Sequence, residues 1–232
     1  MMVSPTHLRD VNVSTRLTNV IRAESGQPEM AVEKEFWNWF VRYEKELFDF
    51  DPDLKAERER IFDKLSTELH KVNSDLTFEF GPNATRREFI VSADGIKSAF
   101  AAVTSLVNCA PKLDRWQLTA FRPRRTPPNV LEFRGRRVDP KDVQFTLLDD
   151  GKNAGITLFI PDFREGDGDW RQIGYLLLDD VLGEFDVESR LGLIKMQSPD
   201  TQTEGQRFPL AELPRAFDLL VSRLSGRSRI PS

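Results

Sequence analysis

The amino-acid sequence predicts an α+β fold in which a mostly antiparallel sheet is built from two copies of one pattern. Each copy consists of a hairpin of two strands, a helix and a third strand, and the copies span residues 76–121 and 142–196. A helical hairpin over residues 30–73 precedes them and packs on the sheet, and a C-terminal helix over residues 210–224 follows. Because each copy alone would leave one apolar face uncovered, we expect both to share a single sheet. A chance likeness between common elements is the alternative to true duplication.

The helical hairpin is predicted from two apolar stripes. In the first, Phe36, Phe40 and Tyr43 are spaced by four and three residues, which places them on one face of a helix. Asp51 is expected to cap the second helix, because an aspartate directly before a proline is a common helix start. The stripe of this second helix comprises Leu54, Ile61, Leu65, Leu69 and Val72.

The strands and helices of the two copies follow from alternation and turn residues. In the first copy, apolar and polar residues alternate over 76–80, and the turn at 81–83 returns the chain. Asp94 is expected to cap the helix that follows, and Pro111 ends it. The second copy has the same order of elements, but the number of residues that separates corresponding elements of the two copies increases after the hairpin. We therefore expect an inserted loop there, residues 161–169.

Length and composition describe an ordinary water-soluble protein. The 232 residues are 39% hydrophobic and 30% charged, with a net charge of -4. The single cysteine, Cys109, cannot form an internal disulfide, which favours a reducing compartment. Residues 1–28 lack the pattern of a secretory signal and are expected to form a mobile arm, and no stretch approaches the ~20 apolar residues that span a bilayer. We therefore expect one cytoplasmic domain over residues 29–232 and no membrane association.

Residues 122–137 form a connector between the copies that is rich in arginine and proline. Its arginines are Arg122, Arg124, Arg125, Arg134, Arg136 and Arg137. A guanidinium group matches the geometry of phosphate and carboxylate groups, so the connector is a candidate surface for an anionic partner. The alternative is a solvated loop whose arginines pair with acidic residues of the same chain. The acidic balance of the whole chain disfavours nucleic acid as a partner.

The inserted loop is acidic, with Asp162, Glu165, Asp167 and Asp169. Carboxylate oxygens suit a hard cation, but the spacing lacks the glycine at the sixth position and the glutamate at the twelfth that an EF-hand has. We therefore favour a solvated loop and predict no metal site. Asp167 or Asp169 is expected to cap the helix that begins near Trp170.

The sequence contains no clear catalytic or cofactor motif. Its histidines are His7 and His70, far apart in sequence, and no glycine-rich phosphate loop occurs. We predict no cofactor. The alternative from another class is a hydrolase or small-ligand enzyme with a pocket between the sheet and the helical hairpin. The residues that would face this pocket are Glu79, Glu88, Arg122 and Arg124.

The first predicted helix carries more aromatic rings than one narrow face can bury. The rings belong to Phe36, Trp37, Trp39, Phe40 and Tyr43. Either the sheet and the last helix nearly surround this helix, or some rings form an exposed apolar strip. Because Trp and Tyr dominate the energy of many protein interfaces, such a strip would bind a partner or a second copy of the chain.

Several strings between residues 30 and 125 carry a resemblance to known proteins. They are Phe36-Trp37-Asn38-Trp39-Phe40, Arg87-Glu88-Phe89-Ile90-Val91-Ser92-Ala93-Asp94-Gly95, Ala110-Pro111 and Trp116-Gln117-Leu118-Thr119-Ala120-Phe121-Arg122-Pro123. With these strings the chain resembles a family of uncharacterised bacterial cytoplasmic proteins. The resemblance implies a bacterial source and an α+β fold, and it brings no established activity and no functional residue.

Together these patterns predict an intracellular protein that acts by binding and not by turnover, with another protein or a second copy of itself as the partner. The residues that we expect to bind are Arg122, Arg124, Arg125, Trp37 and Trp39.

Overall fold

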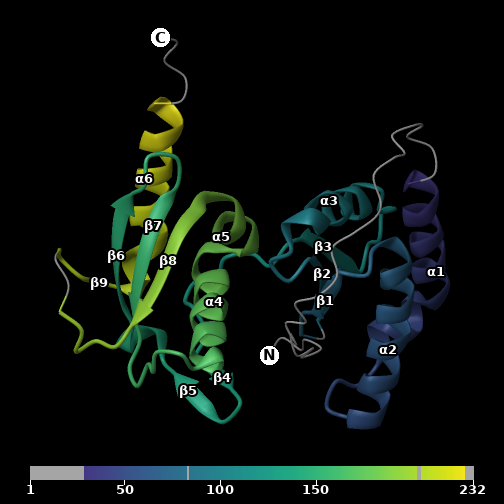
Figure 1. Ribbon diagram of the computed structural model, residues 1–232. Helices are drawn as coiled ribbons and strands as arrows, with labels where there is room; N and C mark the ends of the chain where they lie inside the picture. The colour runs from purple at the N-terminus through teal and green to yellow at the C-terminus, as the bar shows by residue number, and fades with distance from the viewer. Residues whose placement is uncertain (1–28, 83, 203–204, 228–232) are drawn as a thin grey trace, which may run out of the picture. The chain divides into compact units, whose positions relative to one another are not determined.

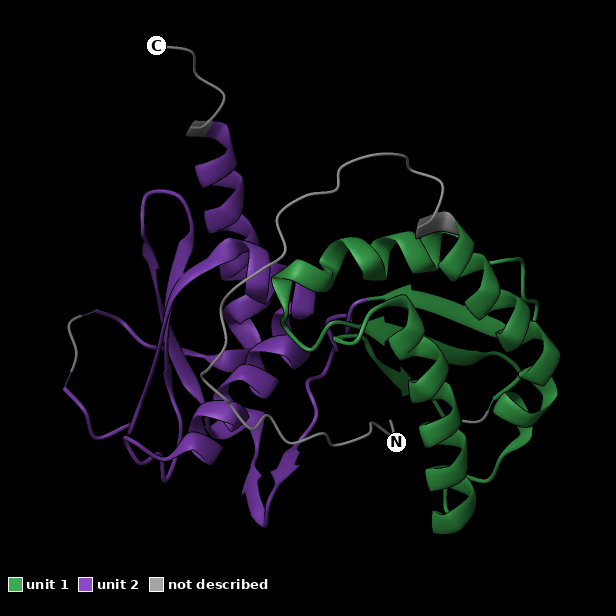
Figure 2. Ribbon diagram, turned by 45° about the vertical axis from the view of Figure 1, so that its right-hand side comes forward, with its two compact units in different colours: residues 1–120 green, residues 121–232 purple. Residues whose placement is uncertain are grey.

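A computed structural model of the protein describes residues 29–82, 84–202 and 205–227. The predicted arm, residues 1–28, lies outside the described residues. The chain divides into two compact units, residues 1–120 and 121–232, which Figure 2 colours green and purple. The sequence pattern predicted one domain over residues 29–232, with no boundary at residue 120. The α+β fold class is confirmed, with helices at the start of the described chain and a helix at its end.

Unit 1 contains three helices and a three-stranded sheet among its described residues (Figure 1). Its elements are α1 (Glu29–Asp49), α2 (Lys55–Val72), β1 (Thr77–Phe80), β2 (Arg87–Ser92), α3 (Phe100–Asn108) and β3 (Trp116–Ala120). The strand order is β1-β2-β3, with β1 and β2 antiparallel and β2 and β3 parallel. The parallel pair requires a crossover, which α3 provides.

Unit 2 contains a small hairpin and a four-stranded sheet among its described residues. Its elements are β4 (Leu131–Phe133), β5 (Arg136–Val138), β6 (Gln144–Asp149), β7 (Ala154–Phe159), α4 (Gly168–Leu182), α5 (Glu184–Arg190), β8 (Leu191–Gln197), β9 (Phe208–Pro209) and α6 (Leu213–Arg227). The strand order of the larger sheet is β8-β7-β6-β9. β6 and β7 are antiparallel, and β7 and β8 are parallel.

Each unit contains the hairpin, helix and strand that the sequence pattern predicts. In both units, the second strand of the hairpin pairs in parallel with a third strand, and a helical segment connects these two strands. A common origin of the two copies stays a prediction. The expectation that the copies share one sheet is wrong, because β1–β3 and β6–β9 form separate sheets. Each sheet has helices of its own unit to cover its apolar face, so neither needs the other copy for that purpose.

Aromatic rings fill the space between the sheet of unit 1 and its helices. The Phe40 ring of α1 lies 5.2 Å from Phe89, and the Phe62 ring of α2 lies 5.2 Å from Phe78, measured between ring centroids. Phe40, Phe78 and Phe89 are fully buried. Because these contacts reach β1 and β2 from both helices, α1 and α2 cover the same face of this sheet.

The core of unit 2 lies between one face of its sheet and the helices α4 and α6. Phe145, Ile156 and Leu158 on the strands pack in one apolar cluster with Ile173 of α4 and Phe217 of α6. The other face is more open: Leu148 is 41% exposed and Leu193 is 37% exposed. One covered and one solvated face are common for a sheet of this kind.

Two of the three helix starts that the sequence analysis proposed are wrong. α2 begins at Lys55 after Leu54, and the Asp51 carboxylate accepts a hydrogen bond from the Asp53 N–H inside the preceding turn. Asp94 has a positive φ of 49° and lies in a turn before a short 3-10 segment at residues 97–99, so it caps no helix. An Asp can stabilise a tight turn as well as a helix start, and the sequence does not distinguish the two.

The third helix start is confirmed. The Asp167 side chain accepts a hydrogen bond from the Asp169 N–H at 3.0 Å and caps α4. Among the described residues, none of the helices combines the length and the apolarity that crossing a bilayer requires.

Candidate binding surfaces

Arg124, a predicted binding residue, makes several polar contacts within unit 2. Its guanidinium group donates to the Leu182 carbonyl oxygen at 2.8 Å, which is one of the last carbonyls of α4. It also donates to the Asp186 carboxylate at 2.6 Å and, through two nitrogens, to Asp218 at 2.8 and 3.0 Å. The hydrogen bond to Asp218, against the opposing effect of burial, raises the pKa of Arg124. This guanidinium is therefore held by α4, α5 and α6.

Arg122 and Arg125 are also held within unit 2. The Arg122 N–H donates to the Glu184 carboxylate at 3.1 Å, and the Glu184 N–H donates to the Arg122 carbonyl oxygen at 3.0 Å. Arg125 Nε lies 3.2 Å from Asp180 Oδ1, and the Arg125 N–H donates to the Asp180 carbonyl oxygen at 2.7 Å. Gly183 joins α4 to α5 here with a φ of +82°, and a Cβ at this position would lie 3.2 Å from the Arg122 carbonyl oxygen. A glycine thus permits the close approach of the connector.

The second half of the connector pairs with the acidic loop. Arg136 Nη2 lies 2.8 Å from Asp167 Oδ2, and its Nη1 lies 3.2 Å from Asp169 Oδ2. Arg134 Nη1 lies 3.0 Å from Asp169 Oδ1. Of the two alternatives that the sequence left open, pairing within the chain is therefore the one that the structure shows. Among the described residues, no group of three or more His, Cys, Asp and Glu is placed to hold a metal ion.

The two tryptophans proposed as binding residues differ in environment. Trp37 is 3% exposed, and its indole Nε1–H donates to the Leu106 carbonyl oxygen of α3 at 2.7 Å. The structure therefore corrects the expectation for Trp37, which belongs to the core. Trp39 is half-buried, and its ring lies 5.3 Å from the half-buried Tyr43 ring one turn later on α1. The Lys64 ammonium of α2 lies 3.6 Å from the centroid of the Tyr43 ring. We call Trp39, Tyr43 and Lys64 the aromatic surface.

No family model matches this chain, and no curated protein or solved structure matches it. The resemblance to uncharacterised bacterial proteins therefore stays an expectation.

Glu79 and Glu88, two residues of the enzyme alternative, lie on the face of the unit 1 sheet that points away from the helical hairpin. Phe78 and Phe89 face the helices, so their strand neighbours Glu79 and Glu88 lie on the opposite face of the sheet. The Glu88 carboxylate accepts a hydrogen bond from the Thr119 hydroxyl at 2.9 Å. The space between the sheet and the helical hairpin, where the pocket was expected, is filled by buried rings.

Sequence reasoning missed a groove in unit 2. It lies where the turn between β6 and β7, the end of α5 and the second half of α6 meet, and its volume is about 500 Å³. The polar residues that line it are Lys152, Asn153, Arg190, Ser222 and Ser225. They come from three segments that are far apart in sequence, so no motif could have identified them.

Proposed function

We propose that this chain is a non-catalytic binding protein of the bacterial cytoplasm and that it binds another protein through the aromatic surface of unit 1. The observation that carries the proposal is the pair of partly exposed rings of Trp39 and Tyr43 on α1. The single cysteine and the resemblance described above support the cytoplasmic and bacterial assignments.

The chemistry of the aromatic surface suits a protein partner. Trp and Tyr combine a large apolar area with few rotatable bonds, which is why they are frequent in the energetic centres of interfaces. The buried Phe36 ring packs beside Trp39: Phe36 is 2% exposed, and the centroids of the two rings lie 6.2 Å apart. A pre-positioned ring loses little side-chain entropy when a partner binds.

The connector contributes less to this proposal than the sequence suggested. Arg122, Arg124 and Arg125 contact acidic residues of unit 2, so an acidic partner would have to compete with these contacts. On the aromatic surface the Lys64 ammonium packs on the Tyr43 ring, and Trp39 stays partly exposed among the described residues.

A quantitative comparison of two variants tests the proposal. Trp39→Ala removes the larger ring, and the matched control Val41→Ala changes a residue of the same helix that is 49% exposed. Proteins retained by the wild-type chain from a bacterial extract are identified, purified and titrated against each variant by calorimetry. We expect Trp39→Ala to weaken binding at least about tenfold, as for an interface centre, and Val41→Ala to leave the affinity unchanged. Equal affinities for the two variants would overturn the proposal, as would retention of no protein at all.

A further inference from the structure

We propose that the groove of unit 2 binds a small anion carrying phosphate or carboxylate groups. This inference is independent of the proposed protein partner, since the aromatic surface belongs to unit 1 and the groove to unit 2. A volume of about 500 Å³ is in the range of pockets that accept metabolite-sized ligands.

The charges that line the groove have one sign. Among the described lining residues, the charged ones are Lys152 and Arg190, and both are cations. Lys152 is exposed in the turn between β6 and β7, and within the described part of the chain its ammonium forms no hydrogen bond or ion pair. Asp150 belongs to the same turn but does not line the groove. A bound anion would therefore meet an ammonium group that needs to give up no protein contact.

Arg190 is positioned but not fully neutralised. Its Nε lies 3.2 Å from Asp186 Oδ1 within α5, which orients the guanidinium group. The same aspartate also binds Arg124 Nη2 at 2.6 Å, so one carboxylate is shared between two guanidinium groups. The charge left on Arg190 is available for a planar, two-oxygen contact of the kind that phosphate and carboxylate groups make.

Neutral groups complete the site. The hydroxyls of Ser222 and Ser225 on α6 and the side-chain amide of Asn153 can each donate a hydrogen bond to an anion. The carbonyl end of α6 opposes an anion with about half an elementary charge. The full charge of Lys152 and the remaining charge of Arg190 outweigh this effect. Because the groove is open to solvent, we expect a dissociation constant on the order of 0.1–1 mM.

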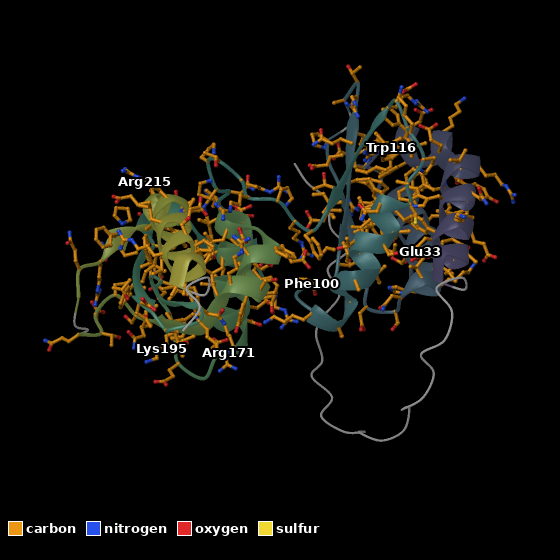
Figure 3. The ribbon with its side chains drawn as sticks, turned by 90° about the horizontal axis from the view of Figure 1, so that it is seen from above. Glu33, Phe100, Trp116, Arg171, Lys195 and Arg215 are labelled. Atoms are coloured by element: carbon orange, nitrogen blue, oxygen red, sulfur yellow. The ribbon has the colours of Figure 1, made fainter. Side chains whose placement is uncertain are left out.

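The test is an NMR titration of the full chain with inorganic pyrophosphate and, separately, with citrate. We expect amide shifts to be confined to residues 152–153, 190–192 and 221–226, and affinity to fall at least about fivefold in Lys152→Ala and in Arg190→Ala. The control is Lys195→Ala, an exposed lysine of β8 that does not line the groove and is labelled in Figure 3. It should leave the affinity unchanged.

The two probes distinguish the possible ligands. Stronger binding of pyrophosphate would assign the groove to phosphate compounds, and stronger binding of citrate would assign it to carboxylates. The proposal is overturned if neither anion shifts these amides at a concentration ten times the weakest expected dissociation constant, which is about 1 mM. It is equally overturned if Lys195→Ala weakens binding as much as Lys152→Ala does, because the attraction would then be a general effect of surface charge.

Discussion

The buried guanidinium group of Arg87 binds the end of α1, where its Nη1 donates to the Phe48 carbonyl oxygen at 3.0 Å. α1 has no basic residue in its last turn, so the cation that favours a helix C-terminus comes from β2 instead. The side chain also donates to the carbonyl oxygens of Leu47 and Gly81. Burial lowers the pKa of Arg87 to about 10, which leaves the group protonated at neutral pH.

Arg87→Met should destabilise the protein by about 2–4 kcal/mol. The substitution keeps an apolar stem but leaves buried carbonyl oxygens without their donor, and each orphaned group costs about 1–3 kcal/mol before the relief of the buried charge is subtracted. The free energy of unfolding is measured in urea. The control is Arg86→Met, because Arg86 is exposed and donates to the Trp116 carbonyl oxygen. The free energy of unfolding of Arg86→Met should fall by only about 1 kcal/mol. Equal losses for the two variants would contradict this role of Arg87.

Glu44 should make unit 1 sensitive to acid. Burial raises the pKa of Glu44, but hydrogen bonds from Arg115 and Trp116 outweigh burial and hold the pKa below its usual value of 4.5. The unfolded chain therefore takes up this proton first as the pH falls. The stability that Glu44 contributes is complete above about pH 4.5 and is lost as the pH falls through the lower folded-state pKa.

The expected result is a flatter pH profile for Glu44→Gln than for the wild type. Unfolding in urea is followed at steps from about pH 6 to pH 3. Glu35→Gln is the control, because Glu35 is exposed on the same helix and forms no ion pair among the described residues. If Glu44→Gln kept the wild-type slope, the ion pair with Arg115 would not be the source of the acid sensitivity.

Arg124→Ala should destabilise unit 2 by about 1–3 kcal/mol at low salt, because charge-assisted hydrogen bonds to Asp186 and Asp218 and one to a backbone carbonyl are lost together. The loss should shrink at 1 M NaCl, where surface charges are screened over a few ångströms. Arg137→Ala is the control, since Arg137 and its partner Glu132 are both more than half exposed. Thermal unfolding at both salt concentrations compares the variants, and a salt-independent loss at Arg124 would show that packing dominates.

Ser105→Ala should lower the free energy of unfolding by more than the small change in side-chain size suggests. The Ser105 hydroxyl donates to Glu33 Oε1 at 2.5 Å, and Glu33 Oε2 is buried with no hydrogen-bond partner among the described residues (Figure 3 labels Glu33). Removing the hydroxyl leaves neither oxygen of the Glu33 carboxylate with a side-chain donor from the described residues, at a cost of about 1–3 kcal/mol. The double variant Glu33→Leu with Ser105→Ala should recover much of this loss, since both polar groups are gone. Additive losses in urea unfolding would refute this coupling.

Local patterns in the sequence were sufficient to predict most of the helices and strands. The strand predicted near residues 191–196 is found as β8, and the helix predicted over 210–224 is found as α6 with a shift of its bounds. The hairpin of β4 and β5 was missed, because its residues lie in a connector that reads as an arginine-rich loop. Its turn at Arg134 and Gly135 has positive φ at both residues, which suits a tight hairpin.

The candidate sites were predicted less well than the fold. Trp37 and Trp39 are two residues apart on one helix, yet the first is buried against α3 and the second is partly exposed. Helical spacing places a side chain on a face, but only the neighbouring elements decide whether that face is covered. Arg124 and Arg125 of the connector were ambiguous for a similar reason, since their partners Asp186 and Asp180 lie more than fifty residues away.

The sequence by itself determined the class of fold, the order of hairpin, helix and strand in each unit, and that Asp167 or Asp169 caps α4, because these depend on residues near one another in the chain. The tertiary structure alone decided that the copies form separate sheets, that the connector binds its own unit, and that Lys152 and Arg190 meet in one groove. These features depend on contacts between distant segments. Such contacts form only where packing brings the segments together, and local spacing carries no record of them.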